Sequence, residues 1–110
     1  MTRLKADFWV RAYLRRLQLA DIAAYLTRKG DATAGAVLVR LDTMDGRATV
    51  FQRSFDLMSG ARTWVVLAEA SEPEITDLIT RQADRDPDLW VVEIEDRQGR
   101  HLLDQPGLDD

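Results

Sequence analysis

The chain begins with a helical pattern of apolar residues. Apolar side chains recur at spacings of three and four, with polar side chains on the opposite side, which is typical of an amphipathic helix. The segment that follows, residues 21–29, is ambiguous. Its alanines and leucine favour helix, whereas its short length and the break at Gly30 favour a strand. The apolar positions of the first helix are Ala6, Trp9, Val10, Tyr13, Leu17 and Ala20.

Strand patterns dominate the middle of the chain. Val37, Val39 and Leu41 fall on one face of an alternating segment, as in a half-buried strand. Asp45-Gly46 follows, and this dipeptide is the strongest short signal for a hairpin turn, so the chain is expected to return antiparallel. The expected segments are a strand over 35–42, a returning strand over 47–53, an irregular surface excursion over 54–61 and a strand over 62–68.

Residues 71–74 carry the signals that start a helix. Ser71 can accept a hydrogen bond from a free amide, and Glu74 completes a capping box. Pro73 lies in the first turn, where its missing N–H costs nothing. The helix is expected to end by Asp86, because Pro87 disfavours helical geometry in the residue before it. Its inner stripe is Ile75, Leu78, Ile79 and Gln82.

The end of the chain has the pattern of a β-hairpin. Asp96 and Gly99 match the first and last positions of a type I turn. If Gly99 also forms the bulge of a three-residue loop, Glu95 pairs with His101, and Ile94 pairs with Leu102. Glu93, Glu95 and His101 then share one face of the hairpin. The other, buried face would hold Trp90, Val92, Ile94 and Leu102.

Three stretches, Phe8 to Arg16, Gly30 to Gly35 and Asp86 to Asp104, resemble a small bacterial family catalogued as domain of unknown function 1491. The resemblance spans nearly the whole chain and implies no established activity or catalytic residues. Members of that family are richer in β-branched residues at the positions of the ambiguous segment. The resemblance, rather than the local sequence, therefore favours a first strand over residues 22–29.

The expected order of elements is helix, four strands, helix, two strands, or α-β-β-β-β-α-β-β. Because this order contains no regular strand-helix-strand repeat, we expect an α+β fold. Its sheet would be mostly antiparallel, with both helices on one side. The 110 residues suit one compact core, so the whole chain, 1–110, is expected to be a single domain.

Composition narrows the possible chemistry. The chain has no cysteine, which excludes disulfides, thiolate zinc sites and cysteine nucleophiles and fits a reducing compartment. No apolar run approaches the ~18 residues needed to cross a bilayer, and the N-terminus lacks the pattern of a secretory signal. We therefore expect a cytoplasmic protein with no metal, cofactor or membrane partner.

The net charge of −4 conceals two halves of opposite sign. Residues 1–55 hold ten Lys and Arg and five Asp, a net charge of +5, whereas residues 56–110 hold five Arg and fourteen Asp and Glu, a net charge of −9. Such halves can neutralise each other within the fold, pair across a dimer, or present a basic surface to an anionic partner. The candidate binding residues are Arg11, Arg15, Arg16, Arg28, Lys29 and Asp31.

Catalytic candidates are few, because His101 is the only histidine. Beside Glu93 or Glu95 it could form an acid–base pair, but a cross-strand pair on an exposed sheet face is the favoured interpretation, so no catalytic residue is assigned. The leading hypothesis is a non-catalytic interaction or accessory module, with an unknown protein partner or self-association as a homodimer. Weak nucleic-acid binding through the basic N-terminal residues is the alternative. An enzyme centred on His101 and Glu95 is the least favoured.

Overall fold

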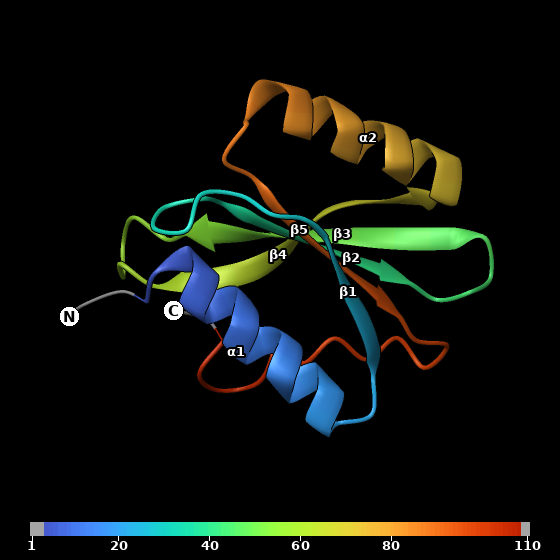
Figure 1. Ribbon diagram of the computed structural model, residues 1–110, viewed down its shortest axis with the longest axis horizontal. Coiled ribbons are helices and arrows are strands. Elements are labelled where there is room, and N and C mark those ends of the chain that lie inside the picture. Colours follow the sequence, from blue (N-terminus) through green and yellow to red (C-terminus); the bar gives the residue numbers. More distant parts are fainter. Residues whose placement is uncertain (1–3, 109–110) are drawn as a thin grey trace.

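Five strands form one sheet with the order β1-β5-β2-β3-β4 in a computed structural model that describes residues 4–108 (Figure 1). Neighbouring strands are antiparallel except β5 and β2, which are parallel. The mostly antiparallel α+β fold is therefore as predicted. The elements in chain order are α1 (Ala6–Leu19), β1 (Ala23–Arg28), β2 (Val37–Asp42), β3 (Arg47–Phe55), β4 (Arg62–Ser71), α2 (Glu72–Arg85) and β5 (Trp90–Glu95).

The strand that was uncertain from sequence is formed. α1 ends at Leu19, and Asp21 takes a positive φ of 62° that turns the chain into β1. β1 then pairs with β5, with Ala23 opposite Glu95. The hydrogen bonds and packing of this long-range pairing stabilise the strand and override the local preference of the alanines and leucine for helix.

The predicted last strand is wrong. β5 lies between β1 and β2 and is hydrogen-bonded to both, so neither of its edges can accept the returning chain. The turn itself is formed as expected: Gly99 N–H donates to the Asp96 carbonyl at 3.0 Å, and Gly99 has a φ of 73°. After this turn, residues 100–104 contain no strand.

The predicted placement of both helices on one side is also wrong, because α1 and α2 cover opposite faces of the sheet (Figure 1). The central strands are apolar on both faces. Val39 and Val92 pack in the cluster that contains α1, whereas Leu38 and Val91 pack in the cluster that contains Ile75 of α2. Strands buried on both faces need a layer on each side, which makes a three-layer structure.

α2 begins as predicted. Ser71 is its N-cap, and Ser71 Oγ accepts a hydrogen bond from Glu74 N–H at 3.5 Å. The helix ends at Arg85, and Asp86 is the C-cap. Neither helix of the described chain is long and apolar enough to pass through a bilayer.

The segment after β5 covers the α1 face instead of pairing as a strand. Leu103 and Leu108 are buried in the α1 cluster. Tyr13 Oη donates to the His101 carbonyl at 2.7 Å, and Arg16 Nη1 donates to the Pro106 carbonyl at 3.0 Å. Trp64 Nε1 donates to the Leu108 carbonyl at 2.8 Å, so the segment is tied to α1 and to β4.

Candidate functional site

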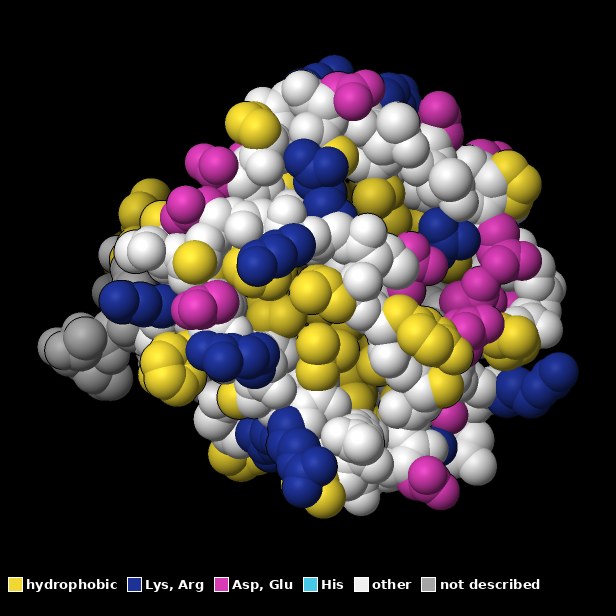
Figure 2. Space-filling model, in the orientation of Figure 1, with side chains coloured by type: hydrophobic (Ala, Val, Ile, Leu, Met, Phe, Trp, Pro, Cys, Tyr) yellow, Lys and Arg dark blue, Asp and Glu magenta, His cyan; other side chains and the backbone are white. Residues whose placement is uncertain are grey.

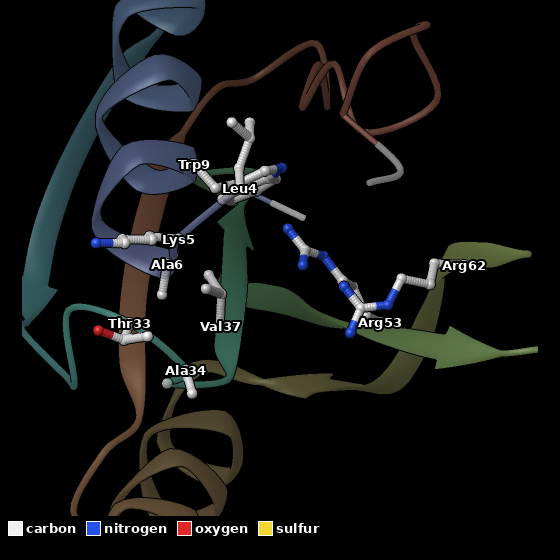
Figure 3. A pocket seen from close by; sticks show the side chains of 10 residues that line it. Leu4, Lys5, Ala6, Trp9, Thr33, Ala34, Val37, Arg53 and Arg62 are labelled. Atoms are coloured by element: carbon white, nitrogen blue, oxygen red, sulfur yellow. The ribbon is translucent and has the colours of Figure 1, made fainter. Parts of the chain in front are cut away.

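A pocket of about 310 Å³ lies between the start of α1, the connection between β1 and β2, and the pair β3–β4 (Figure 3). Its volume is at the lower end of the range for small-ligand sites. The side chains differ in kind, because apolar and basic groups from four segments meet there. The lining residues are Leu4, Lys5, Ala6, Trp9, Thr33, Ala34, Gly35, Val37, Arg53 and Arg62.

The connection between β1 and β2 caps α1 with its own carbonyl groups. Lys5, the N-cap residue, makes no side-chain capping bond. Instead, Ala6 N–H donates to the Thr33 carbonyl at 3.2 Å, and Asp7 N–H donates to the Ala32 carbonyl at 3.0 Å. These bonds satisfy two of the amides that a helix start leaves free, and so they fix one wall of the pocket to α1.

Asp31 shapes this connection. Its Oδ2 accepts from the N–H groups of Thr33 and Ala34 at 3.1 and 2.9 Å. Its carbonyl accepts from Trp90 Nε1 at 2.7 Å, and its N–H donates to the Asp88 carbonyl at 3.0 Å. All of these contacts lie within the fold, and they give Asp31 a structural role.

The two glycines of the connection are required by close packing. A Cβ atom on Gly30 or on Gly35 would overlap the Asp88 carbonyl, and one on Gly35 would also overlap the Trp90 indole. Neither glycine has a positive φ, so close approach rather than backbone conformation explains them. The packing of this loop against residues 86–90 accounts for the Gly30 to Gly35 motif without a ligand.

Arg53 stacks on two tryptophans beside the pocket. Its guanidinium carbon lies 4.6 Å from the centre of the Trp9 ring and 5.2 Å from that of Trp64, and the two ring centres are 5.2 Å apart. Trp64 is directly opposite Arg53 in the β3–β4 register. Stacking holds the plane of the guanidinium, and this fixes the directions in which its N–H groups can donate.

The remaining charges of the pocket are also positive. The side chains of Lys5 and Arg62 make no hydrogen bond or ion pair with any other residue in the described range 4–108. No Asp, Glu or His is among the described residues that line the pocket. Lys5 and Arg62 therefore add positive charge that is not compensated within the described residues, although the protein has a net charge of −4. This arrangement attracts an anionic group.

Exposed apolar side chains adjoin the basic pocket. Leu4, which lines it, is 51% exposed, and Phe55, directly opposite Arg62 on the neighbouring strand, is 52% exposed. In the turn that follows, Leu57 and Met58 are 89% and 95% exposed. We call Phe55, Leu57 and Met58 the apolar rim. Large apolar side chains that are exposed next to one another are typical of interaction sites.

Asp56 orders the turn that presents the apolar rim. Its Oδ1 accepts from Met58 N–H at 2.9 Å, and its Oδ2 accepts from Ser59 Oγ at 3.0 Å. These bonds lower the pKa of the Asp56 carboxyl, the bond from Met58 having the larger effect. The carboxylate therefore stays ionised and keeps the turn closed at neutral pH.

None of the six residues predicted to bind lines this pocket. Arg11 is exposed, and its Nη2 lies 3.7 Å from Asp7 Oδ2. Arg15 donates to Gln18 within α1, and Arg28 Nη2 donates to the Pro87 carbonyl at 3.4 Å. Figure 2 shows Lys and Arg side chains gathered over α1 and the chain beyond β1, with the largest group of Asp and Glu toward the other end. Of the other residues predicted to bind, Arg16 is bonded to the Pro106 carbonyl, Lys29 is exposed, and Asp31 lies in the connection between β1 and β2.

Lys5, Arg53 and Arg62 were not predicted from the sequence as site residues. They come from three separate segments, and only the tertiary fold brings them together. No local signal was available, because position 53 lies between Gln52 and Ser54 in a partly polar strand.

His101 does not form the predicted pair with Glu95, because the strand that would align them is absent. Its ring stacks on Phe51, with ring centres 4.6 Å apart, and its Nδ1 accepts from Leu103 N–H at 3.0 Å. Partial burial lowers the pKa of His101, against a smaller opposing effect of Asp104. Within residues 4–108, no group of three or more His, Cys, Asp or Glu is placed to hold a metal ion.

The chain is similar in sequence and in fold to proteins of one family. A family model described as "Protein of unknown function (DUF1491)" matches residues 4–104. A crystal structure of a DUF1491 family protein from Caulobacter crescentus CB15 is 44% identical, with a TM-score of 0.84, covering 94% of this chain and 98% of that one. An NMR structure of a DUF1491 family protein from Caulobacter crescentus CB15 is also 44% identical, with a TM-score of 0.81, covering 96% of this chain and 97% of that one. The solution structure of protein Atu0922 from A. tumefaciens is 34% identical, with a TM-score of 0.76, covering 96% of this chain and 98% of that one. None of the curated proteins matches this chain.

Proposed function

Because this chain belongs to the DUF1491 family of proteins of unknown function, we infer its role from its structure. We propose that it is a non-catalytic interaction module. In this proposal, the basic pocket beside the apolar rim is the surface that binds the partner. The absence of cysteine supports a cytoplasmic location for it.

One observation carries the proposal: the pocket is lined by Lys5 and Arg62, whose side chains make no hydrogen bond or ion pair within residues 4–108, in a protein that is acidic as a whole. Lys5 is exposed and Arg62 is partly buried, so both cations are accessible to an opposite charge that would stabilise them. An anionic group on a partner would supply that charge, so binding is the simplest use of the pocket.

The same pocket offers little for catalysis. Among the described residues that line it, none is a histidine, carboxylate, serine or cysteine that could act as a general base or nucleophile. Thr33 is the one hydroxyl, and no base adjoins it in the lining set. A cationic, aromatic surface of this kind binds and orients an anion, and this supports a binding role over an enzymatic one.

Nucleic acid is the second candidate partner. The basic side chains of α1 and of the chain after β1 support it, because Arg11 and Arg15 on α1 and Lys29 after β1 are exposed. Figure 2 shows Lys and Arg side chains gathered on this face. Arg16 and Arg28 weaken it, because both donate hydrogen bonds to backbone carbonyls of the protein itself. Fewer free cations mean fewer phosphate contacts, and phosphate contacts supply most of the affinity for nucleic acid.

A pull-down of the tagged protein from lysate of its native bacterium tests the proposal. Wild-type protein, Arg62→Glu and the control Arg97→Glu, which reverses an exposed charge in the turn after β5, are compared with and without nuclease. We expect a stoichiometric protein that survives nuclease, is retained by the control and is lost with Arg62→Glu. An untagged copy of the same chain in the eluate would identify self-association through the oppositely charged halves. If the retained material is lost after nuclease treatment, the nucleic-acid-binding alternative would be favoured.

A further inference from the structure

The outer edge of β4 has no partner strand. β4 ends the sheet order β1-β5-β2-β3-β4, and within residues 4–108 it pairs with β3 alone. In the same described range, no backbone group of residues 62–70 bonds to a turn, loop or helix cap. The unpaired N–H and C=O groups at a sheet edge form a template on which another strand can pair.

The composition of β4 favours such pairing. The strand has ten residues, and none of them is the Lys or Pro with which natural proteins commonly protect an edge. Val65 and Val66 at its middle are 37% and 54% exposed. β1, at the opposite edge of the sheet, has six residues, and its one charged side chain, Arg28, donates to the Pro87 carbonyl. β4 is therefore the longer of the two open edges.

The two charged side chains of β4 share one face of the sheet. Residues 62 and 69 are an odd number apart, which places them on opposite faces of a regular strand. However, Leu67 has no counterpart in β3 and forms a bulge, which shifts the alternation by one residue. Arg62 therefore lies opposite Phe55 and Glu69 lies opposite Thr49, two positions of β3 that are an even number apart and face the same way.

Pairing of two copies about a two-fold axis brings these opposite charges together. With Val65 of each copy at the axis, antiparallel pairing places Trp64 of one copy opposite Val66 of the other. Farther from the axis, the bulge lets Arg62 of one copy lie opposite Glu69 of the other, and the symmetry repeats this pair. We infer that β4 is a self-pairing edge through which two copies of this chain join their sheets into one continuous sheet.

Both charged groups can take part in this arrangement. Arg62 makes no hydrogen bond or ion pair within the described residues, and Figure 3 shows its side chain beside that of Arg53. Rotation toward the edge would move it from a like charge to an opposite one. Glu69 is exposed, and its Oε2 accepts from Thr49 Oγ1 at 3.3 Å, which leaves Oε1 to accept from Arg62 of the second copy.

This inference rests on the proposed function and names the partner. In the proposed function, Arg62 binds an anionic group of another protein. Here that group is the Glu69 carboxylate of a second copy, and backbone hydrogen bonds between the two β4 strands supply further affinity.

Sedimentation equilibrium of the full chain over a series of concentrations tests the edge. Val65→Lys places two like charges directly opposite each other at the axis, so we expect this variant to be monomeric where wild type is dimeric. Leu26→Lys is the matched control on the edge strand β1, where the leucine is 41% exposed, and it should dimerise like wild type. Circular dichroism checks that both variants are folded.

A charge exchange tests the register. Arg62→Glu should weaken the dimer about tenfold, because it places like charges opposite each other at two symmetry-related positions. Glu69→Arg should weaken it to a similar extent. The double variant, Arg62→Glu with Glu69→Arg, should regain the wild-type dissociation constant, because each copy then presents the opposite charge to the other.

A wild-type chain that stays monomeric at millimolar concentration would overturn the inference. Dimers that Leu26→Lys abolishes and Val65→Lys leaves intact would also overturn it, as would a double variant no tighter than either single one. Its failure is distinguishable from failure of the proposed function. If the chain is monomeric but a lysate protein is still lost with Arg62→Glu, the proposed function stands and self-pairing is wrong. If dimers form as expected but the lysate yields no protein that Arg62→Glu releases, self-pairing stands and binding of a cellular partner at the basic pocket fails.

Discussion

Replacement of Tyr13 by phenylalanine isolates the contact that ties the final segment to α1. The ring of Tyr13 is fully buried, and its hydroxyl donates to the His101 carbonyl at 2.7 Å. Phenylalanine keeps the ring but leaves this carbonyl without its partner. A neutral hydrogen bond contributes about 1 kcal/mol, and an unsatisfied carbonyl adds a further cost, so we expect Tyr13→Phe to lower the free energy of unfolding by about 1–2 kcal/mol. With a urea dependence of about 2 kcal/mol/M, the unfolding midpoint should fall by about 0.5–1 M.

The pH dependence of the same variant is more diagnostic. Burial raises the pKa of Tyr13 in the folded protein above that of an unfolded tyrosine, which is about 10. A raised folded pKa means that the stabilisation is complete below the unfolded pKa and is lost as the pH rises above it. Wild-type protein should lose up to about 1.4 kcal/mol per pH unit in that range, whereas Tyr13→Phe should not. The gap between the two proteins should therefore close near pH 11.

Urea unfolding from neutral pH to pH 11 measures this gap, with Tyr25→Phe as the matched control. Tyr25 is half exposed, and its hydroxyl makes no hydrogen bond within the described residues. The control should change stability by less than about 0.5 kcal/mol, as surface substitutions usually do. A Tyr13→Phe gap below about 0.5 kcal/mol at neutral pH, or one that stays constant up to pH 11, would refute the reasoning.

Two further predictions concern the loops. Gly35→Ala should lower the free energy of unfolding by about 1–3 kcal/mol in urea or thermal unfolding, because its Cβ would overlap the Asp88 carbonyl and the Trp90 indole; an unchanged midpoint would show that the connection can move away. Hydrogen bonds from Arg100 are the main cause of the lowered pKa of Asp96, so its contribution is present above the unfolded pKa and is lost as the pH falls through the folded pKa. The difference in stability between wild type and Asp96→Asn should therefore shrink as the solution is acidified, and a constant difference would contradict this linkage.

Local signals in the sequence were sufficient for most elements. The Ser71 cap, the Asp45-Gly46 turn and the helical spacing of Trp9 and Tyr13 each predicted an element that the structure contains. These signals are local because capping, turn geometry and helical periodicity depend on residues a few positions apart. The resemblance to the DUF1491 family is confirmed, and it correctly placed the first strand where propensity was ambiguous.

Long-range pairing explains what the sequence analysis missed. The Asp96 to Gly99 turn is real, but its signal cannot show that β5 already has partners on both edges. Leu38 lies on the face that also carries Arg40, and one apolar residue there was not enough to predict that α2 would cover it. The candidate site was missed for the same reason, because Arg53 and Arg62 meet Lys5 only after the sheet and α1 have assembled.

The central position of β5 has a consequence for how the protein is made. β5 is the last strand to leave the ribosome, yet β1 has no other partner in the sheet and β2 has only β3 without it. The β2–β3–β4 meander can form while the chain is being synthesised, whereas β1 must wait until Trp90 to Glu95 has emerged. Contacts between residues so far apart in sequence slow folding, and the exposed edges of β1 and β2 are open to wrong pairing in the meantime. Nascent chains that stall before Trp90 should therefore depend on chaperones more than full-length chains do.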